Sequence, residues 1–121
     1  MTHRSYKDLK VWQKADALFY EICQEVARWP RNLITGTLIG QVVRSAGSIS
    51  ANIVEGYGRG TKKEFQRYLR VARGSAVETD NWLCKAKNLK YMPAERYNHY
   101  EEKIAEIVKM TNSFMHALNP S

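Results

Sequence analysis

The stretch RSAGSISANIVEGYGRGTKKEFQRYLRVARGSAVE, residues 44–78, decides how this chain folds. It opens with small residues interrupted by single apolar ones, passes through a segment with glycine at every second position, and ends in a basic segment. On both sides of the glycine segment, apolar or small residues recur three or four positions apart, which is the spacing of one helix face. The stretch therefore predicts two amphipathic helices joined by a short connection.

The same period continues outward in both directions. Towards the N-terminus it runs from Leu9 to Trp29 and stops at Pro30, which lacks an N–H and disfavours helical geometry before it. Towards the C-terminus it resumes after Pro93 and reaches Leu118. Because no useful strand alternation accompanies it, the predicted fold class is all-α, an antiparallel up-down four-helix bundle. The predicted helices cover about residues 8–29, 36–57, 61–90 and 93–118.

Each predicted helix has one apolar face that is expected to point inward. On the first helix this face is Trp12, Ala15, Phe19, Ile22, Val26 and Trp29. On the third helix it is Phe65, Leu69, Ala72, Ala76, Thr79, Leu83 and Ala86. Any of Asn32, Thr35 and Thr37 can cap the second helix, and Thr61 with Glu64 forms the capping-box pattern that starts the third.

Length and composition predict one domain over residues 1–121, with tails at 1–6 and 119–121 outside the bundle. No apolar run approaches the ~20 residues of a membrane span, and the first residues contain no apolar leader segment. Cys23 and Cys84 lie far apart without a C-x-x-C partner, which favours reduced thiols in a cytoplasmic protein over a disulfide or zinc site.

No residue set indicates catalysis, a cofactor or a metal. A di-iron bundle needs Glu-x-x-His pairs that face inward, and none of the three histidines has a glutamate three residues before it. The serines between 45 and 50 have no sequence motif that links them to a histidine or lysine that could activate them. We therefore expect a protein that is not an enzyme.

Positive charge is concentrated in one part of the chain. The whole sequence has a net charge of +7 and a pI of about 9.5. Residues 44–73 carry seven basic residues against two acidic ones, a net charge of +5: Arg44, Arg59, Lys62, Lys63, Arg67, Arg70 and Arg73. Helical spacing places Lys63, Arg67 and Arg70 on one face. This basic stripe is either a phosphate-binding surface for nucleic acid or a solvated face with intrahelical ion pairs.

The small residues and glycines have a structural interpretation. Gly47 and Gly74 lie inside predicted helices, where glycine costs about 1 kcal/mol relative to alanine, so we expect close helix packing at both. The segment 52–60, NIVEGYGRG, resembles a phosphate-binding glycine loop but follows a helix and lacks the P-loop ending. We favour a helix C-terminus with Gly56 or Gly58 in left-handed geometry.

A second stripe follows the third helix beside its main apolar face. Tyr68, Ser75, Trp82 and Leu89 recur every seven residues. The helices of a bundle monomer bury one seam each, so this stripe needs a broad core or a neighbouring subunit. Tyr68, Trp82 and Leu89 are therefore candidates for an oligomer interface.

Three segments resemble the bacterial four-helix-bundle family, also called the 23S rRNA intervening-sequence protein family: DLKVWQKA (8–15), QVVRSAGSISANIVEGYGR (41–59) and FQRYLRVARGSAVE (65–78). The resemblance runs from about Tyr6 to Leu118 and implies an up-down bundle that forms a ring-like homopentamer without catalytic activity. Related accessory proteins of diversity-generating retroelements form similar basic pentamers that bind nucleic acid and a reverse transcriptase. This chain departs from the family pattern at Ser50, where proline is common, and at Lys90, where glycine is common.

Three polar residues match positions of the family motif: Asn52, Glu55 and Glu78. They form either a ligand-binding cluster or a buried network, completed by Gln41 or Arg44, that holds the second and third helices in register. We favour the buried network, because charges inside a bundle must be paired.

Together these observations predict a non-catalytic, homo-oligomeric basic protein of the cytoplasm that needs no cofactor. We expect it to bind RNA or DNA through phosphate contacts with little sequence specificity. The alternative is an interaction scaffold or accessory subunit that docks an acidic protein or a partner enzyme such as a reverse transcriptase.

Overall fold

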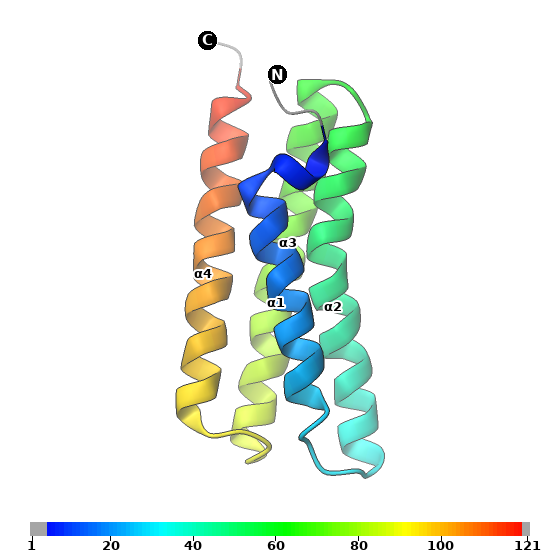
Figure 1. Cartoon of the computed structure of the whole chain (residues 1–121), viewed down its shortest axis with the longest axis vertical. Coiled ribbons are helices and arrows are strands. Elements are labelled where there is room, and N and C mark those ends of the chain that lie inside the picture. The colour runs from blue at the N-terminus through cyan, green and yellow to red at the C-terminus, as the bar shows by residue number, and fades with distance from the viewer. Residues whose placement is uncertain (1–4, 120–121) are drawn as a thin grey trace.

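The computed structural model describes residues 5–119, and within them the chain is helical without strands. A short 3-10 helix precedes four α-helices: η1 (Tyr6–Asp8), α1 (Lys10–Val26), α2 (Leu33–Gly58), α3 (Lys62–Asn88) and α4 (Ala94–Ala117). Successive α-helices run in opposite directions, and the α2–α3 connection lies at the same end as η1 and the end of α4 (Figure 1). The predicted antiparallel four-helix bundle is confirmed.

The helices surround a single hydrophobic core. α1 packs beside α2 and α4, and α3 also packs beside α2 and α4. Within the described residues, the backbones of α1 and α3, and those of α2 and α4, lie diagonally opposite and do not come close to each other. Part of the predicted N-terminal tail, residues 1–6, is folded. Ser5 caps η1, and the Tyr6 ring packs edge-on against Trp12 at a centroid distance of 5.1 Å. The remaining tail residues, 1–4 and 120–121, lie outside the described residues.

On α1 the buried face is rotated slightly from the predicted one. Val11, Ala15, Leu18, Ile22, Glu25 and Trp29 are buried along α1 and just beyond it, four and three residues apart. Trp12, Phe19 and Val26 are only partly buried and pack against the edge of the core. Within α1, the branched and small side chains point into the bundle, whereas the rings of Trp12 and Phe19 lie at the edge of the core. On α3 every residue of the predicted face is buried.

Small residues bring α2 and α3 close together. The buried positions of the two helices include Ser45, Ala46, Ala72, Ser75 and Ala76. Among the glycines, Gly56 leaves the least room for a side chain: a Cβ atom there would lie 2.8 Å from the Cβ of Tyr68 and 3.3 Å from the backbone oxygen of Phe65. An alanine cannot fit there without displacing backbone.

The other glycines differ from the sequence-based expectation. A Cβ on Gly47 would lie 3.4 Å from the Phe19 ring, which is ordinary contact, but a Cβ on Gly74 would meet nothing within 4 Å. The close packing expected at Gly74 is therefore wrong. The left-handed residue of the α2–α3 connection is Gly60, with φ of +86°, because α2 continues through the two glycines predicted for that role.

The starts of α2 and α3 and the end of α3 follow known capping rules. Asn32 caps α2, since its side-chain oxygen accepts from the Thr35 N–H at 2.9 Å, and the Thr61 hydroxyl accepts from the Glu64 N–H at 3.1 Å. α3 ends in a Schellman arrangement, in which the Tyr91 N–H donates to the Ala86 carbonyl. Lys90 occupies the left-handed position of that arrangement, with φ of +68°.

Candidate nucleic-acid interface

A basic surface surrounds the α2–α3 connection and the first turns of α3. We define it as Arg59, Lys62, Lys63, Arg67 and Arg70, all exposed. Exposed ion pairs connect Arg59 with Glu55 at 3.5 Å and Arg67 with Glu64 at 3.2 Å. Lys62, Lys63 and Arg70 form no ion pair: among residues 5–119, no carboxylate oxygen lies within 4.0 Å of their side-chain nitrogens.

Two of the predicted binding residues lie away from this surface. Arg44 donates to Gln41 and pairs with Glu78 near the middle of the α2–α3 seam. Arg73 is only partly exposed and donates from Nη1 to Oδ1 of Asn112 on α4 at 2.8 Å. The structure therefore groups five of the seven predicted cations around the α2–α3 connection and the first turns of α3, whereas Arg44 and Arg73 bind side chains of a neighbouring helix.

Tyr68 lies within the basic surface. The guanidinium carbons of Arg59 and Arg67 lie 5.3 and 5.0 Å from the centroid of its ring, which are cation–π distances. Hydrogen bonding to Glu64 raises the pKa of Arg67, so this guanidinium stays charged. Tyr68, predicted as an interface residue, is thus part of an arginine–tyrosine–arginine cluster.

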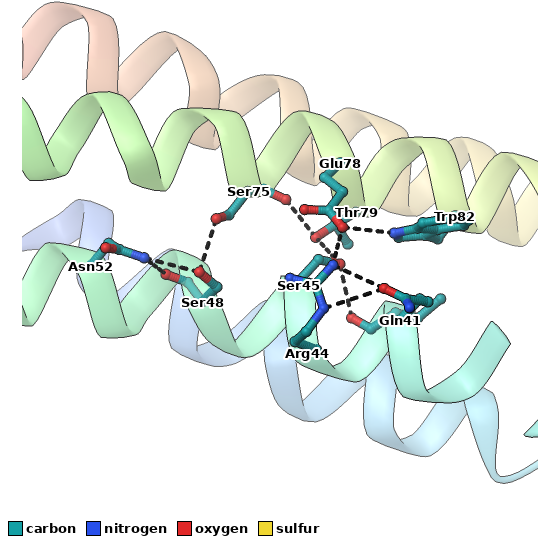
Figure 2. A network of polar contacts seen from close by, with 10 residues as sticks. Gln41, Arg44, Ser45, Ser48, Asn52, Ser75, Glu78, Thr79 and Trp82 are labelled. Carbon is teal, nitrogen blue, oxygen red and sulfur yellow. Dashed lines mark hydrogen bonds and ion pairs between the residues drawn. The ribbon is translucent and has the colours of Figure 1, made fainter. Parts of the chain in front are cut away.

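A polar network joins α2 to α3 at the middle of the bundle (Figure 2). Arg44 donates from Nε and Nη2 to Oε1 of Gln41, at 3.3 and 3.0 Å, and from Nη2 to the Glu78 carboxylate. Trp82 donates from Nε1 to Oε2 of Glu78 at 3.0 Å. The hydrogen bond from Trp82, together with the hydrogen bond and charge of Arg44, holds the pKa of Glu78 below its ordinary value despite its desolvation.

The network continues along the same seam through amide and hydroxyl groups. Asn52 donates from Nδ2 to the carbonyl and hydroxyl of Ser48, at 2.7 and 2.9 Å, and the Ser48 and Ser75 hydroxyls lie 2.9 Å apart. The Thr79 hydroxyl donates to the Ser75 carbonyl at 2.8 Å and lies 2.9 Å from the Ser45 hydroxyl (Figure 2). These contacts hold the two helices in register.

The structure corrects the prediction for Glu55. It brings Gln41, Asn52 and Glu78 into the α2–α3 network, but this network is not buried as predicted, since the Arg44 and Glu78 side chains are 55% and 35% exposed. Glu55 lies outside the network, is exposed and pairs with Arg59 on the outside of the bundle. Residues that are two positions apart in a helix point in directions about 200° apart around its axis. Glu55 therefore cannot lie on the inward face that carries the buried Ile53. Its occurrence in a motif position gave no indication of the direction in which it points.

Sequence reasoning missed a buried charge at the opposite end of the bundle. Glu25 on α1 is 2% exposed and accepts two hydrogen bonds from Arg96 of α4, at 2.8 and 3.1 Å. Trp29 donates from Nε1 and Tyr100 from its hydroxyl to the same carboxylate, at 3.0 and 2.9 Å. The available signal was the spacing from Ile22, which places Glu25 at a core position between two apolar residues.

The surroundings of Glu25 favour its charged form. Burial acts to raise the pKa of this carboxyl, but hydrogen bonds from Arg96, Trp29 and Tyr100 and the charge of Arg96 outweigh it, so the pKa lies below the ordinary value. Burial and the hydrogen bond to Glu25 raise the pKa of the Tyr100 hydroxyl, which therefore stays protonated as the donor of that bond. The cluster fastens α1 to α4.

An apolar groove lies between the start of α2 and the end of α3, away from the basic surface. Its lining consists of Leu33, Ile34, Thr37, Leu38, Gln41, Trp82, Lys85 and Leu89. Leu33, Ile34 and Leu89 are 87%, 63% and 46% exposed. Trp82 and Leu89 were predicted for an oligomer interface, whereas Leu33 and Ile34 were missed because they precede the helix start predicted at residue 36.

A shallow groove lies between α3 and α4. Its charged lining residues are Asp80, Glu101, Glu102 and Lys109, and the others are apolar or neutral polar side chains. In the described part of the chain, no group of His, Cys, Asp and Glu residues has an arrangement that could hold a metal ion. No helix of that part is long and apolar enough to cross a membrane.

The fold and these surfaces define a basic antiparallel four-helix-bundle protein. Residues 7–113 match the profile of the 23S rRNA-intervening sequence protein family, and the chain belongs to that family. It is also similar to a crystal structure from Bacteroides thetaiotaomicron, described as a protein with unknown function from the S23 ribosomal protein family. That similarity has a TM-score of 0.77 at 25% identity and covers 87% of this chain and 97% of the other. No curated protein matches the sequence.

Proposed function

We propose that this chain is a non-catalytic, homo-oligomeric protein that binds RNA or DNA through backbone phosphates with little sequence specificity. The observation that carries the proposal is the basic surface, in which Lys62, Lys63 and Arg70 have no carboxylate partner within the described residues. Lysine and arginine contacts of this kind position a nucleic acid without reading its sequence.

The remaining cations of the basic surface are available at small cost. The side chains of Arg59 and Arg67 are 49% and 62% exposed, and their glutamate partners are 53% and 42% exposed. Exposed pairs of this kind contribute about 0–1 kcal/mol, so a phosphate can replace the carboxylate with little loss. The ion pairs of Arg59 and Arg67 are those expected of a solvated helix face, but they are weak enough to allow phosphate binding.

Self-association is supported by the apolar groove. Exposed leucine and isoleucine side chains beside Trp82 leave apolar surface that a second subunit would cover. The family resemblance implies a homopentamer, and a ring repeats the basic surface in every subunit, which raises the local positive potential.

Light scattering at micromolar concentration tests self-association. We expect an oligomer for the wild type and dissociation on Leu33→Glu with Ile34→Glu, because charge would enter the groove. Tyr20→Glu is the matched control, since Tyr20 is 60% exposed on α1 and does not line the groove. A wild-type monomer at this concentration would contradict the oligomer.

A second function is favoured by the same groove. An interaction scaffold or accessory subunit would use it to dock a protein partner, such as an acidic protein or a reverse transcriptase. Lys85 on the groove wall suits a partner with acidic residues beside its apolar contact. This function becomes the better one if no nucleic acid binds at low salt.

Titration of labelled single- and double-stranded RNA and DNA at several salt concentrations tests the first function. Phosphate binding must weaken steeply as salt rises, because each neutralised phosphate releases counterions. The test variant is Arg67→Ala with Arg70→Ala. The matched control is Arg28→Ala with Arg31→Ala, which removes equal charge from exposed arginines at the opposite end of the bundle. Absence of binding at low salt contradicts the proposal.

A further inference from the structure

The arginine–tyrosine–arginine cluster contains three planar groups at the centre of the basic surface. The guanidinium carbons of Arg59 and Arg67 lie 5.3 and 5.0 Å from the Tyr68 ring centroid. The cluster draws on two helices, because Arg59 follows the last turn of α2 and the other two residues lie in the second turn of α3. All three side chains are at least partly exposed.

The position of Tyr68 is fixed by the close contact of α2 with α3. A Cβ on Gly56 would lie 2.8 Å from the Tyr68 Cβ, so the base of the tyrosine side chain packs directly on the backbone of α2. The two guanidiniums are held in turn by Glu55 and Glu64 at 3.5 and 3.2 Å. The base of the Tyr68 side chain is therefore positioned before any ligand arrives, which lowers the entropic cost of stacking on its ring.

We propose that this cluster is a stacking platform for unpaired nucleobases, so that the basic surface binds single-stranded nucleic acid in preference to a duplex. The inference rests on the proposed nucleic-acid binding and names its substrate class. A contact with the phosphates of a duplex backbone needs only charges, so the aromatic ring beside the two guanidiniums adds nothing to it. Bases of a single strand stack on aromatic rings and on arginine planes.

The surrounding cations suit a strand that passes over the cluster. Lys63, Arg67 and Arg70 follow one face of α3 and extend over about 10 Å of helix. Lys63 and Arg70 flank Arg67 along this face and have no carboxylate partner in the described residues. A strand whose phosphates follow these cations would bring its bases within reach of the Tyr68 ring. A duplex would present the same phosphates with its base faces already stacked inside.

Fluorescence anisotropy with three labelled probes of equal length tests the inference: an oligouridylate, the same backbone without bases, and a blunt RNA duplex. The wild type should bind the oligouridylate most tightly. Tyr68→Leu should weaken that binding by roughly 5- to 150-fold, the effect of losing one stacked base, and leave the other two probes unchanged. Tyr68→Phe is the control, since it keeps the ring and should bind the oligouridylate as the wild type does.

The possible failures are distinguishable. If no probe binds at low salt, the proposed nucleic-acid binding itself is wrong. If all three probes bind equally and Tyr68→Leu does not alter their ranking, phosphate binding stands and the stacking platform is overturned. If Tyr68→Leu changes the mass measured by light scattering, the ring belongs to a subunit interface and the platform is overturned as well.

Discussion

Replacing Glu25 by alanine tests the buried charge cluster that fastens α1 to α4. The substitution removes the acceptor of four hydrogen bonds, two from Arg96 and one each from Trp29 and Tyr100. Trp29 and Tyr100 are 4% and 6% exposed, so their donors would remain buried without a partner, at about 1–3 kcal/mol each. The Arg96 side chain is 37% exposed and can recover water. We expect a loss of about 3–5 kcal/mol in the free energy of unfolding.

Urea denaturation followed by circular dichroism at fixed protein concentration measures this loss. The control is Glu21→Ala one turn earlier, which removes an exposed contact with His99 at 2.9 Å and should cost less than about 1 kcal/mol. Glu25→Gln should fall between the two, because it keeps an acceptor but loses the charge. Equal losses for Glu25→Ala and Glu21→Ala would refute the reasoning.

Three further predictions concern stability. Because the folded-state pKa of Glu25 is lowered, the stabilisation that its charge provides is present above pH 4.5 and disappears as pH falls through the folded pKa. The difference in free energy of unfolding between wild type and Glu25→Ala should therefore shrink as the solution is acidified. A difference that stays constant with pH would contradict this. In urea denaturation, Gly56→Ala should lower the free energy of unfolding by about 1–3 kcal/mol, because the new methyl group overpacks the α2–α3 contact. Gly74→Ala should raise it by up to about 1 kcal/mol, because its methyl group meets open space and alanine is the better helix former. Equal effects of the two substitutions would contradict this difference in packing. Lys90→Gly should raise stability by about 1 kcal/mol in the same assay, because glycine adopts the φ of +68° without strain, and a loss would contradict that reason.

The helical period was enough to predict the fold. Apolar residues three and four apart, interrupted by Pro30 and Pro93, identified the helices, and the Thr61 cap was found from its pattern. The period did not fix the rotation of α1 to within one residue, because apolar residues occupy two adjacent stripes of that helix. Packing against α2 decided between them and placed Phe19 at the edge of the core, beside Gly47.

The candidate site was predictable in composition but not in arrangement. The charge count identified the cations, but only the three-dimensional structure separates the basic surface from Arg44, which Glu78 binds across the seam. The seven-residue spacing identified Tyr68, but its contact with two arginines depends on Arg59, which follows the end of α2. Partners that are distant in sequence, such as Glu25 and Arg96, left no local pattern to read.

The most direct measurement of the central claim is the slope of log Kobs against log salt concentration for a labelled single strand. We predict that Arg67→Ala with Arg70→Ala flattens the slope by about 1.4, two phosphate contacts at ~0.7 each, whereas Arg28→Ala with Arg31→Ala leaves it unchanged. Equal slopes for the two pairs would contradict a defined binding surface and leave only the net charge of the chain to explain binding.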